Sequence, residues 1–371
     1  EICGRFEKKG CLELPVNRTV NAAVFTDATQ LMLFTSDGLV WAESAANDEK
    51  GINYTTYVFF SYQYWLYTQT RKVSDKKYES LFNNSDGVRV SRYIKIKNLY
   101  KNRRGDDTLV NELQKMPYLS FGRINKPLES NMSNADGLKR VLGAGLYFSY
   151  DSKLAFRAGC DFAAITHTNP RGYLAAGVYA AVIAEIISKH SLEESITTAV
   201  SILQEYEHGS TTFEIIRKAV YFAKESDIRP LAAMHKLYYG DKKKEDSLEP
   251  TAEYADNVLA CALFSALIHG KTDFKNAVRL SCNYDGPSEV TAAITGSIVG
   301  AMHGTGAIPD SWERKLQMRN LINDSALDLY SISVASDDDE EEHERLSSLS
   351  KEELKELKSK HKAEEDDEYY K

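Results

Sequence analysis

The chain has 371 residues, of which 43 % are hydrophobic and 27 % charged, a composition typical of a globular protein with a sizeable core. The net charge of −8 is confined to residues 337–371, whose 15 acidic and 7 basic side chains leave 39 of each sign in the rest of the chain. Because residues 1–336 are neutral and have no basic stripe, we expect no nucleic-acid partner. Because no run of about 18 apolar residues occurs, we expect no membrane partner.

The cysteines are odd in number and widely spaced. The sequence contains no CxxC pair that would indicate a zinc site. This usage favours reduced, buried thiols over a disulfide framework, and therefore a cytoplasmic location. The five residues are Cys3, Cys11, Cys160, Cys261 and Cys282.

The N-terminal third contains two long apolar segments. Residues 21–42 place an acidic turn, Thr26-Asp27-Ala28-Thr29, directly ahead of an apolar helix. Residues 54–70 have the length of a helix, although their Tyr, Phe and Val content leaves a strand open. Residues 91–107, with basic side chains, are expected to form a surface loop.

Helical signals dominate from residue 138 onward. Apolar residues recur at spacings of three and four in 149–168, and 171–190 is apolar nearly all round, as in a buried central helix. Ser191 and Glu194 have the spacing of a capping box. Further helices are expected over 211–226, 251–270, 273–286 and 288–304. The fold class predicted is all-α, one compact bundle-like domain over residues 1–330.

Residues 331–371 differ in kind. They begin with the charge run SDDDEEEHE and continue with LSKEELKELKSKHK, in which Glu and Lys are spaced as in a solvated helix. An acidic tail, disordered with a nascent helix, is expected here rather than a docking element.

Four collinear stretches resemble the ADP-ribosylglycohydrolase family, of the type that reactivates dinitrogenase reductase. They are FTDATQLMLFTSDGLVWA (25–42), YQYWLYTQT (62–70), AAITHTNPRGYLAAGVYAAVIAEII (163–187) and residues 274–322, which contain Ile-Pro-x-x-Trp at 308–312. The resemblance implies a compact all-helical domain with two Mg²⁺ ions that hydrolyses the bond between ADP-ribose and its acceptor. EICGRFEKKGCLEL resembles the segment that comes after the family's first helix, so that helix is absent from this sequence.

The metal motifs implied by the resemblance are altered. The N-terminal ligands correspond to Thr26, Asp27 and Ala28, so one carboxylate is missing. The C-terminal motif, usually Asp-Ser-Asp-Ser/Thr, reads Pro-Ser-Glu-Val here and leaves Glu289 as its one acid. Because Mg²⁺ requires several oxygen ligands, weak or absent binding of Mg is expected, with Thr26, Asp27 and Glu289 as the remaining metal ligands.

The resemblance also supplies candidates for contact with ADP-ribose. Residues 134–145 resemble the family's Gly-rich phosphate loop, but Asp136 stands where the first glycine would be and would repel a phosphate. No residue is assigned as catalytic. The expected substrate-binding residues are Gly137, Arg140, His167, Asn169, Gly172 and Tyr173. Three of them also have an ordinary structural explanation: hydrogen bonding for His167, and packing for Gly172 and Tyr173.

These departures favour a pseudoenzyme, a catalytically impaired homologue that acts in binding or regulation. Two alternatives stay open. One is an active hydrolase in which Asp27 and Glu289 hold a single Mg²⁺; the other is a structural protein, since this fold also occurs as a lens crystallin. ADP-ribose or an ADP-ribosylated protein is the expected partner, and the sequence does not give the oligomeric state.

Overall fold

The computed structural model describes residues 10–45, 52–70, 90–103, 107–116, 131–240 and 254–335, which form helices and connecting segments without a β-strand. The all-α prediction is confirmed. By its internal contacts the chain divides into two compact units. The first unit combines Glu1–Val24 with Gly122–Gln317, and the second combines Phe25–Phe121 with Met318–Lys371.

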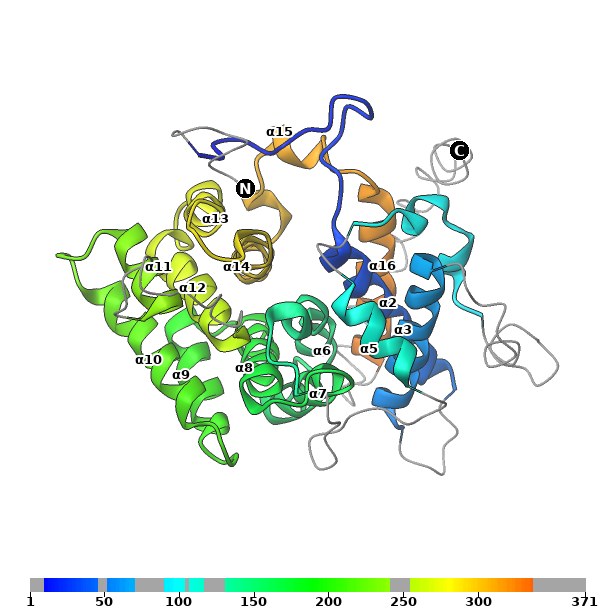
Figure 1. Cartoon of the computed structure of the whole chain (residues 1–371), viewed down its shortest axis with the longest axis horizontal. Coiled ribbons are helices and arrows are strands. Elements are labelled where there is room, and N and C mark those ends of the chain that lie inside the picture. Colours follow the sequence, from blue (N-terminus) through cyan, green and yellow to red (C-terminus); the bar gives the residue numbers. More distant parts are fainter. Residues whose placement is uncertain are drawn as a thin grey trace. The chain divides into compact units, whose positions relative to one another are not determined.

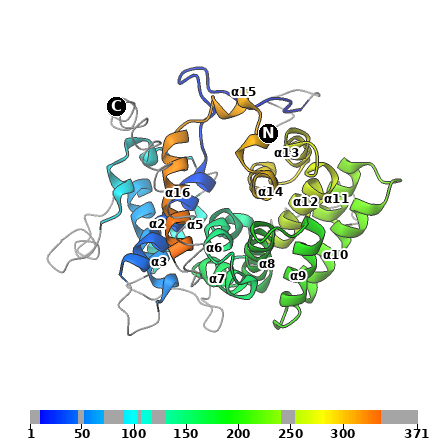
Figure 2. The same ribbon diagram turned by 180° about the vertical axis from the view of Figure 1, so that it is seen from behind.

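The first unit is built around one central helix, α8 (Pro170–Ile187), which packs against helices from both earlier and later parts of the chain (Figure 1). The view from behind shows the same arrangement (Figure 2). In chain order the other elements of this unit are η5 (Ala135–Arg140), α6 (Leu142–Tyr147), α7 (Ser152–Ala164), α9 (Leu192–Leu203), α10 (Ser210–Lys224), α11 (Pro230–Tyr239), α12 (Ala255–His269), α13 (Phe274–Cys282), α14 (Ser288–His303), η7 (Thr305–Ala307) and α15 (Asp310–Glu313).

Small residues explain why α8 is central. A Cβ atom added at Gly177 would lie 2.4 Å from Cys160 Sγ, and one at Gly159 would lie 2.7 Å from Ala180 Cβ, so the two glycines let α7 and α8 approach closely. By length and composition α8 is also apolar enough to cross a membrane, the one such helix among the described residues, but 83 % of its apolar window is buried inside the protein. This burial is the property of a core helix, as the sequence predicted.

Local signals set the helix ends. Asn169 caps α8 by accepting a hydrogen bond from the Arg171 N–H, and Pro170 occupies the first helical position, where its missing N–H costs nothing. The capping box predicted for α9 is present, with Ser191 and Glu194 bonded reciprocally. The expected helices over 211–226, 251–270, 273–286 and 288–304 correspond to α10, α12, α13 and α14.

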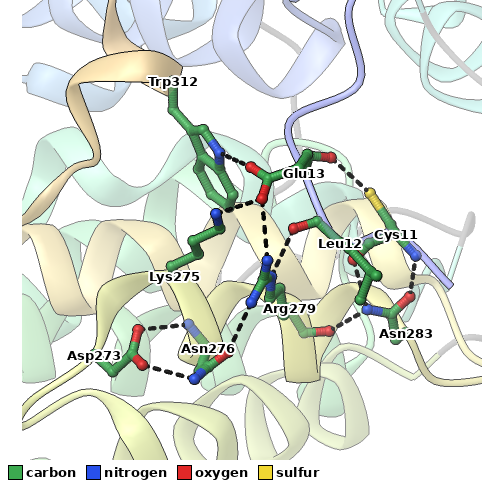
Figure 3. A network of polar contacts seen from close by, with 9 residues as sticks. All are labelled: Cys11, Leu12, Glu13, Asp273, Lys275, Asn276, Arg279, Asn283 and Trp312. Carbon is green, nitrogen blue, oxygen red and sulfur yellow. Dashed lines mark hydrogen bonds and ion pairs between the residues drawn. The ribbon is translucent and has the colours of Figure 1, made fainter. Parts of the chain in front are cut away.

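A polar network ties the start of the chain to the end of the first unit (Figure 3). The Glu13 carboxylate accepts hydrogen bonds from Lys275 Nζ at 2.5 Å and from Trp312 Nε1 at 3.0 Å. The bond from Lys275 is the main reason that the pKa of Glu13 lies below its usual value. The side chain of Asn283 bonds both the N–H and the carbonyl of Cys11, at 2.6 and 2.9 Å.

The second unit contains α2 (Asp27–Ser44), α3 (Tyr54–Thr70), η3 (Arg92–Lys95), η4 (Lys97–Tyr100), α5 (Thr108–Lys115) and α16 (Arg319–Ala335). Helix α2 packs against both α3 and α16. Residues 54–70 are a helix, which removes the strand alternative. The expected surface loop over 91–107 is wrong in part: residues 92–100 form two 3-10 turns, and the side chains of Tyr93 and Leu99 are fully buried because they pack into the core of this unit.

Two predictions about the chain ends and cysteines remain partly outside the described residues. Helix α16 runs to Ala335, and the rest of the acidic tail, residues 336–371, is not described, so the boundary at residue 330 stays a prediction. Cys11, Cys160, Cys261 and Cys282 are free thiols, while Cys3 lies outside the described residues.

Candidate functional site

His167 is the centre of the predicted substrate-binding set, and it is completely buried in the first unit. It follows α7, in the connection that leads into α8. Its Nδ1 lies 2.8 Å from the hydroxyl of Thr166, and its Nε2 lies 2.6 Å from Oδ1 of Asn134. Arg140 Nη2 donates to the same Thr166 hydroxyl at 2.6 Å. Both ring nitrogens are therefore engaged by the protein itself.

This chain of hydrogen bonds fixes the protonation state of His167. Because Asn134 Oδ1 can only accept, Nε2 carries a proton, and in the neutral ring Nδ1 then accepts from the Thr166 hydroxyl. Burial, reinforced by the charges of Arg140 and Lys139, holds the pKa of His167 well below its usual value. The result is a neutral imidazole whose hydrogen bonds are structural.

Gly137 and Gly172 lie against the same ring. A Cβ atom at Gly137 would lie 3.2 Å from His167 Cγ, and one at Gly172 would lie 3.1 Å from the Met132 carbonyl oxygen and 3.3 Å from His167 Cβ. Neither glycine has a positive φ. Close packing around His167 therefore explains both glycines without a ligand.

Arg140 and Asp136, on η5, are both engaged by protein groups. The Arg140 side chain is fully buried, and its Nη2 also donates to the Ala163 carbonyl at 2.9 Å. The Asp136 carboxylate forms an ion pair with Lys139 at 2.8 Å. This pairing offsets the negative charge of Asp136, which reduces the repulsion of a phosphate that the sequence alone suggested.

Asn169 and Tyr173 complete the predicted set, and they point to different neighbours. Asn169 Nδ2 donates to Oδ1 of Asn131 at 3.1 Å while its own Oδ1 caps α8. The side chain of Tyr173 is buried, and this burial, with Cys160 and Glu207 nearby, raises its pKa. The structure therefore gathers five of the six predicted residues around the segment 131–140 and directs Tyr173 toward Cys160 and Glu207.

The N-terminal metal-ligand candidates lie at the start of α2, in the second unit. Thr26 is the N-cap residue of α2, in extended conformation, and its side chain makes no capping hydrogen bond. Asp27 is the first helical residue and is 4 % exposed, and Ala28 is buried beside it. A carboxylate at this position is stabilised by the positive end of the helix dipole.

The C-terminal candidate, Glu289, lies in the first turn of α14, in the first unit, and is exposed to solvent. The side chains that face inward at this turn are those of Val290, 7 % exposed, and Thr291, fully buried. The Thr291 hydroxyl lies 2.7 Å from the hydroxyl of Tyr284 and donates to the Pro287 carbonyl at 3.0 Å. The inward face of this turn therefore presents a methyl pair and a hydroxyl that already has protein partners.

These donors do not fit a pair of Mg²⁺ ions. Two adjacent dications need several carboxylates, and the predicted ligand set supplies two, Asp27 in one unit and the exposed Glu289 in the other. Among the described residues no group of three or more His, Cys, Asp or Glu side chains is arranged to hold a metal ion. Whether Thr26, Asp27 and Glu289 share one ion stays a prediction.

The comparison with protein families decides the assignment. Residues 4–338 match the family described as ADP-ribosylglycohydrolase. The chain belongs to the ADP-ribosylglycohydrolase family. A solved structure titled "ADP-ribosylglycohydrolase-related protein complex" is 20 % identical, with 83 % of this chain and 82 % of that chain covered, and its TM-score of 0.46 is too low to add to the assignment. No curated protein sequence matches.

In this family member, the sequence did not reveal which residues hydrogen-bond the candidate residues and hold them in place. Asn134 and Thr166 hold the two nitrogens of His167, and both lie in stretches that resemble the family. Asp256 and Asn257, which hold Arg171 at the start of α8, lie 85 and 86 residues away from it in the chain. No local pattern could have paired them, because only the tertiary fold brings α12 to α8.

Proposed function

We propose that this ADP-ribosylglycohydrolase family member binds ADP-ribose or an ADP-ribosylated protein and hydrolyses it poorly or not at all. The observation that carries the proposal is the first turn of α14, where Val290 and the already bonded Thr291 face inward and Glu289 faces solvent. The side chain of valine has no oxygen atom to bind a metal ion, and Ala28, where the resemblance implies a carboxylate, removes a second oxygen ligand. The binding half of the proposal rests on family membership.

Thermal unfolding separates this proposal from its alternatives. The melting temperature is measured with excess ADP-ribose, once with Mg²⁺ and once with a chelator. A ligand at 100 times its dissociation constant stabilises the folded state by about 2.7 kcal/mol, which is readily measured. The proposal predicts equal stabilisation in the two conditions.

Two variants that each lose one negative charge test whether Asp27 takes part in the response to ADP-ribose. Asp27→Asn removes the remaining N-terminal carboxylate, and Asp310→Asn makes the same change at a side chain that is 82 % exposed. The proposal predicts that both variants respond to ADP-ribose like the natural sequence. Stabilisation that requires Mg²⁺ and disappears only in Asp27→Asn would instead support the hydrolase with a reduced metal site. No response to ADP-ribose in either condition would overturn binding and favour a structural role.

A further inference from the structure

Two cysteines from opposite ends of the first unit's sequence, Cys11 and Cys282, meet at the end of α13. Cys11 lies in the N-terminal segment that precedes α2, and Cys282 is the last residue of α13. Both carry reduced thiols, and Cys11 is buried while Cys282 is half-buried. Neither belongs to the predicted substrate-binding or metal-ligand sets, so the proposed function leaves this pair unexplained.

Asn283, the residue after Cys282, holds the backbone of Cys11 against the end of α13 (Figure 3). Its Oδ1 accepts a hydrogen bond from the Cys11 N–H at 2.6 Å, and its Nδ2 donates to the Cys11 carbonyl at 2.9 Å. Gly10 permits this close approach, because its φ is +70° and an added Cβ atom would lie 2.4 Å from Asn283 Oδ1. The backbone around Cys11 is therefore fixed in place before any covalent bond forms.

The thiol of Cys282 is directed toward the same place. Its Sγ donates to the Arg279 carbonyl oxygen at 3.5 Å, and Asn283 Nδ2 donates to that same oxygen at 2.8 Å. Arg279 Nε in turn donates to the carbonyl of Leu12, next to Cys11, at 2.7 Å. Burial raises the pKa of Cys282 to about 12, and the neighbouring Cys11 thiol raises it further through repulsion and a hydrogen bond. The two thiols therefore lie close together.

The other two described cysteines are enclosed in the core. Cys160 on α7 and Cys261 on α12 are completely buried, and burial is the main reason that the pKa of each thiol lies above its usual value. Buried thiols of this kind are inert, because exchange with a small molecule requires access to the sulfur. The half-buried Cys282 is therefore the thiol at which oxidation can begin.

We propose that Cys11 and Cys282 form a reversible disulfide under oxidising conditions, which fastens the N-terminal segment covalently to the end of α13. The oxidant is a low-molecular-weight disulfide such as oxidised glutathione. The Cys282 thiolate attacks one of its sulfurs, which forms a mixed disulfide and releases a small thiolate that takes up the proton lost by Cys282. The Cys11 thiolate then attacks the Cys282 sulfur, which forms the protein disulfide and releases the second small thiolate, and this takes up the proton lost by Cys11.

In sum, two cysteine thiols are oxidised and one small disulfide is reduced to two thiols, so an excess of small thiol reverses the reaction. The second step is intramolecular, and the hold of Asn283 on Cys11 gives it a high effective concentration. The raised pKa of Cys282 makes the first step slow at neutral pH and faster as the pH rises, because the thiolate is the nucleophile. The disulfide is independent of the function proposed above.

The test is peptide mapping of the full chain after incubation with oxidised glutathione at mildly alkaline pH. The protein is then denatured, its remaining thiols are alkylated, and it is digested without reductant. We expect one disulfide-linked pair of peptides, which contains Cys11 and Cys282 and disappears after treatment with excess reduced glutathione. Cys160 and Cys261 are expected to be alkylated. The absence of a link between Cys11 and Cys282, or a link through Cys160 or Cys261, would overturn the proposal.

Two serine variants distinguish this pair from a pair formed by the other N-terminal cysteine. Cys11→Ser removes one partner but keeps a hydroxyl that can donate to the Glu13 carbonyl, as the thiol does at 3.2 Å. Cys3→Ser makes the same substitution at a residue outside the described part of the chain. Cys11→Ser is expected to stop at the mixed disulfide of Cys282 with glutathione, whereas Cys3→Ser is expected to form the link like the natural sequence. Loss of the link in Cys3→Ser would overturn the proposal.

The melting temperature tests whether the bond fastens the segment. Oxidation is expected to raise the melting temperature of the natural sequence and of Cys3→Ser, because a disulfide that closes a long loop restricts the unfolded chain. It is expected to leave the melting temperature of Cys11→Ser without this rise. Equal melting temperatures for the oxidised and reduced natural sequence would overturn the claim that the disulfide stabilises the attachment of the N-terminal segment.

Discussion

The connection into α8 carries two neighbouring polar residues, His167 and Arg171, that differ in their exposure to solvent. Around His167 both ring nitrogens are bonded and the ring is fully buried. Around Arg171, two residues from the cap of α8, Nε and Nη2 of the guanidinium are held by Asp256 and Asn257, and the side chain is 25 % exposed. The ring of His167 is thus enclosed by protein groups, whereas Arg171 beside it is paired but still partly exposed.

The largest effect is expected from breaking the ion pair of Arg171. Asp256→Ala removes a fully buried carboxylate and leaves the charge of Arg171 without its partner. Removing one member of a buried pair typically costs about 3–5 kcal/mol of unfolding free energy. Denaturant unfolding measures it, with Asp310→Ala, at a side chain that is 82 % exposed, as the control. A loss no larger than that of the control would show that Asp256 does not hold Arg171.

A smaller effect is expected from crowding the His167 ring. Gly137→Val adds a branched side chain where a Cβ alone would lie 3.2 Å from His167 Cγ and 3.4 Å from Ala163 Cβ. Overpacking of a filled core costs about 1–3 kcal/mol. Gly300→Ala is the control, since nothing lies within 4 Å of its added Cβ, and it is expected to stabilise α14 slightly. Equal stability of the two variants would argue against a closely packed His167 ring.

Because His167 is buried, we expect the free energy of unfolding to depend on pH, with a change no larger than that expected for Gly137→Val. Its pKa is lowered in the folded state, so between about pH 6.5 and the folded pKa the unfolded chain binds a proton that the folded protein does not. Stability is therefore lost as the pH falls below about 6.5, by at most about 1.4 kcal/mol per pH unit.

The comparison with His167→Gln isolates this contribution. Glutamine keeps a donor and an acceptor but does not titrate, so the variant is expected to show a flatter stability profile between about pH 5 and 7. Urea unfolding across that range gives the two profiles. Parallel profiles for the variant and the natural sequence would mean that His167 is not held neutral.

The smallest effect is expected at an exposed ion pair of α10. Arg217 and Glu214 form an ion pair whose side chains are 66 % and 58 % exposed. Exposed pairs contribute little, so Arg217→Ala is expected to change unfolding free energy by less than about 0.5 kcal/mol. A larger loss in denaturant unfolding would indicate that this ion pair contributes more to stability than its exposure suggests.

The sequence predicted the helices well because their signals are local. The capping box at Ser191 and Glu194 and the apolar, small-residue run of α8 are both readable within one helix. The same reasoning failed at residues 92–100, where basic side chains concealed the buried Tyr93 and Leu99.

The candidate site was predictable only in part. The resemblance to the family placed Gly137, Gly172 and His167 in one substrate-binding set, which stays a prediction. The packing of both glycines on the imidazole depends on contacts between separate segments, which the sequence does not show. The clamp of Asp256 on Arg171 depends on tertiary structure alone, as does the orientation that turns Val290 inward and Glu289 outward.

The most direct measurement of the central claim is the release of ADP-ribose from peptides ADP-ribosylated on arginine and on serine, with Mg²⁺ present and with a chelator. We expect no release above the uncatalysed rate in either condition, and we expect ADP-ribose to bind independently of Mg²⁺. Mg²⁺-dependent release that is lost in Asp27→Asn and retained in Asp310→Asn would contradict it.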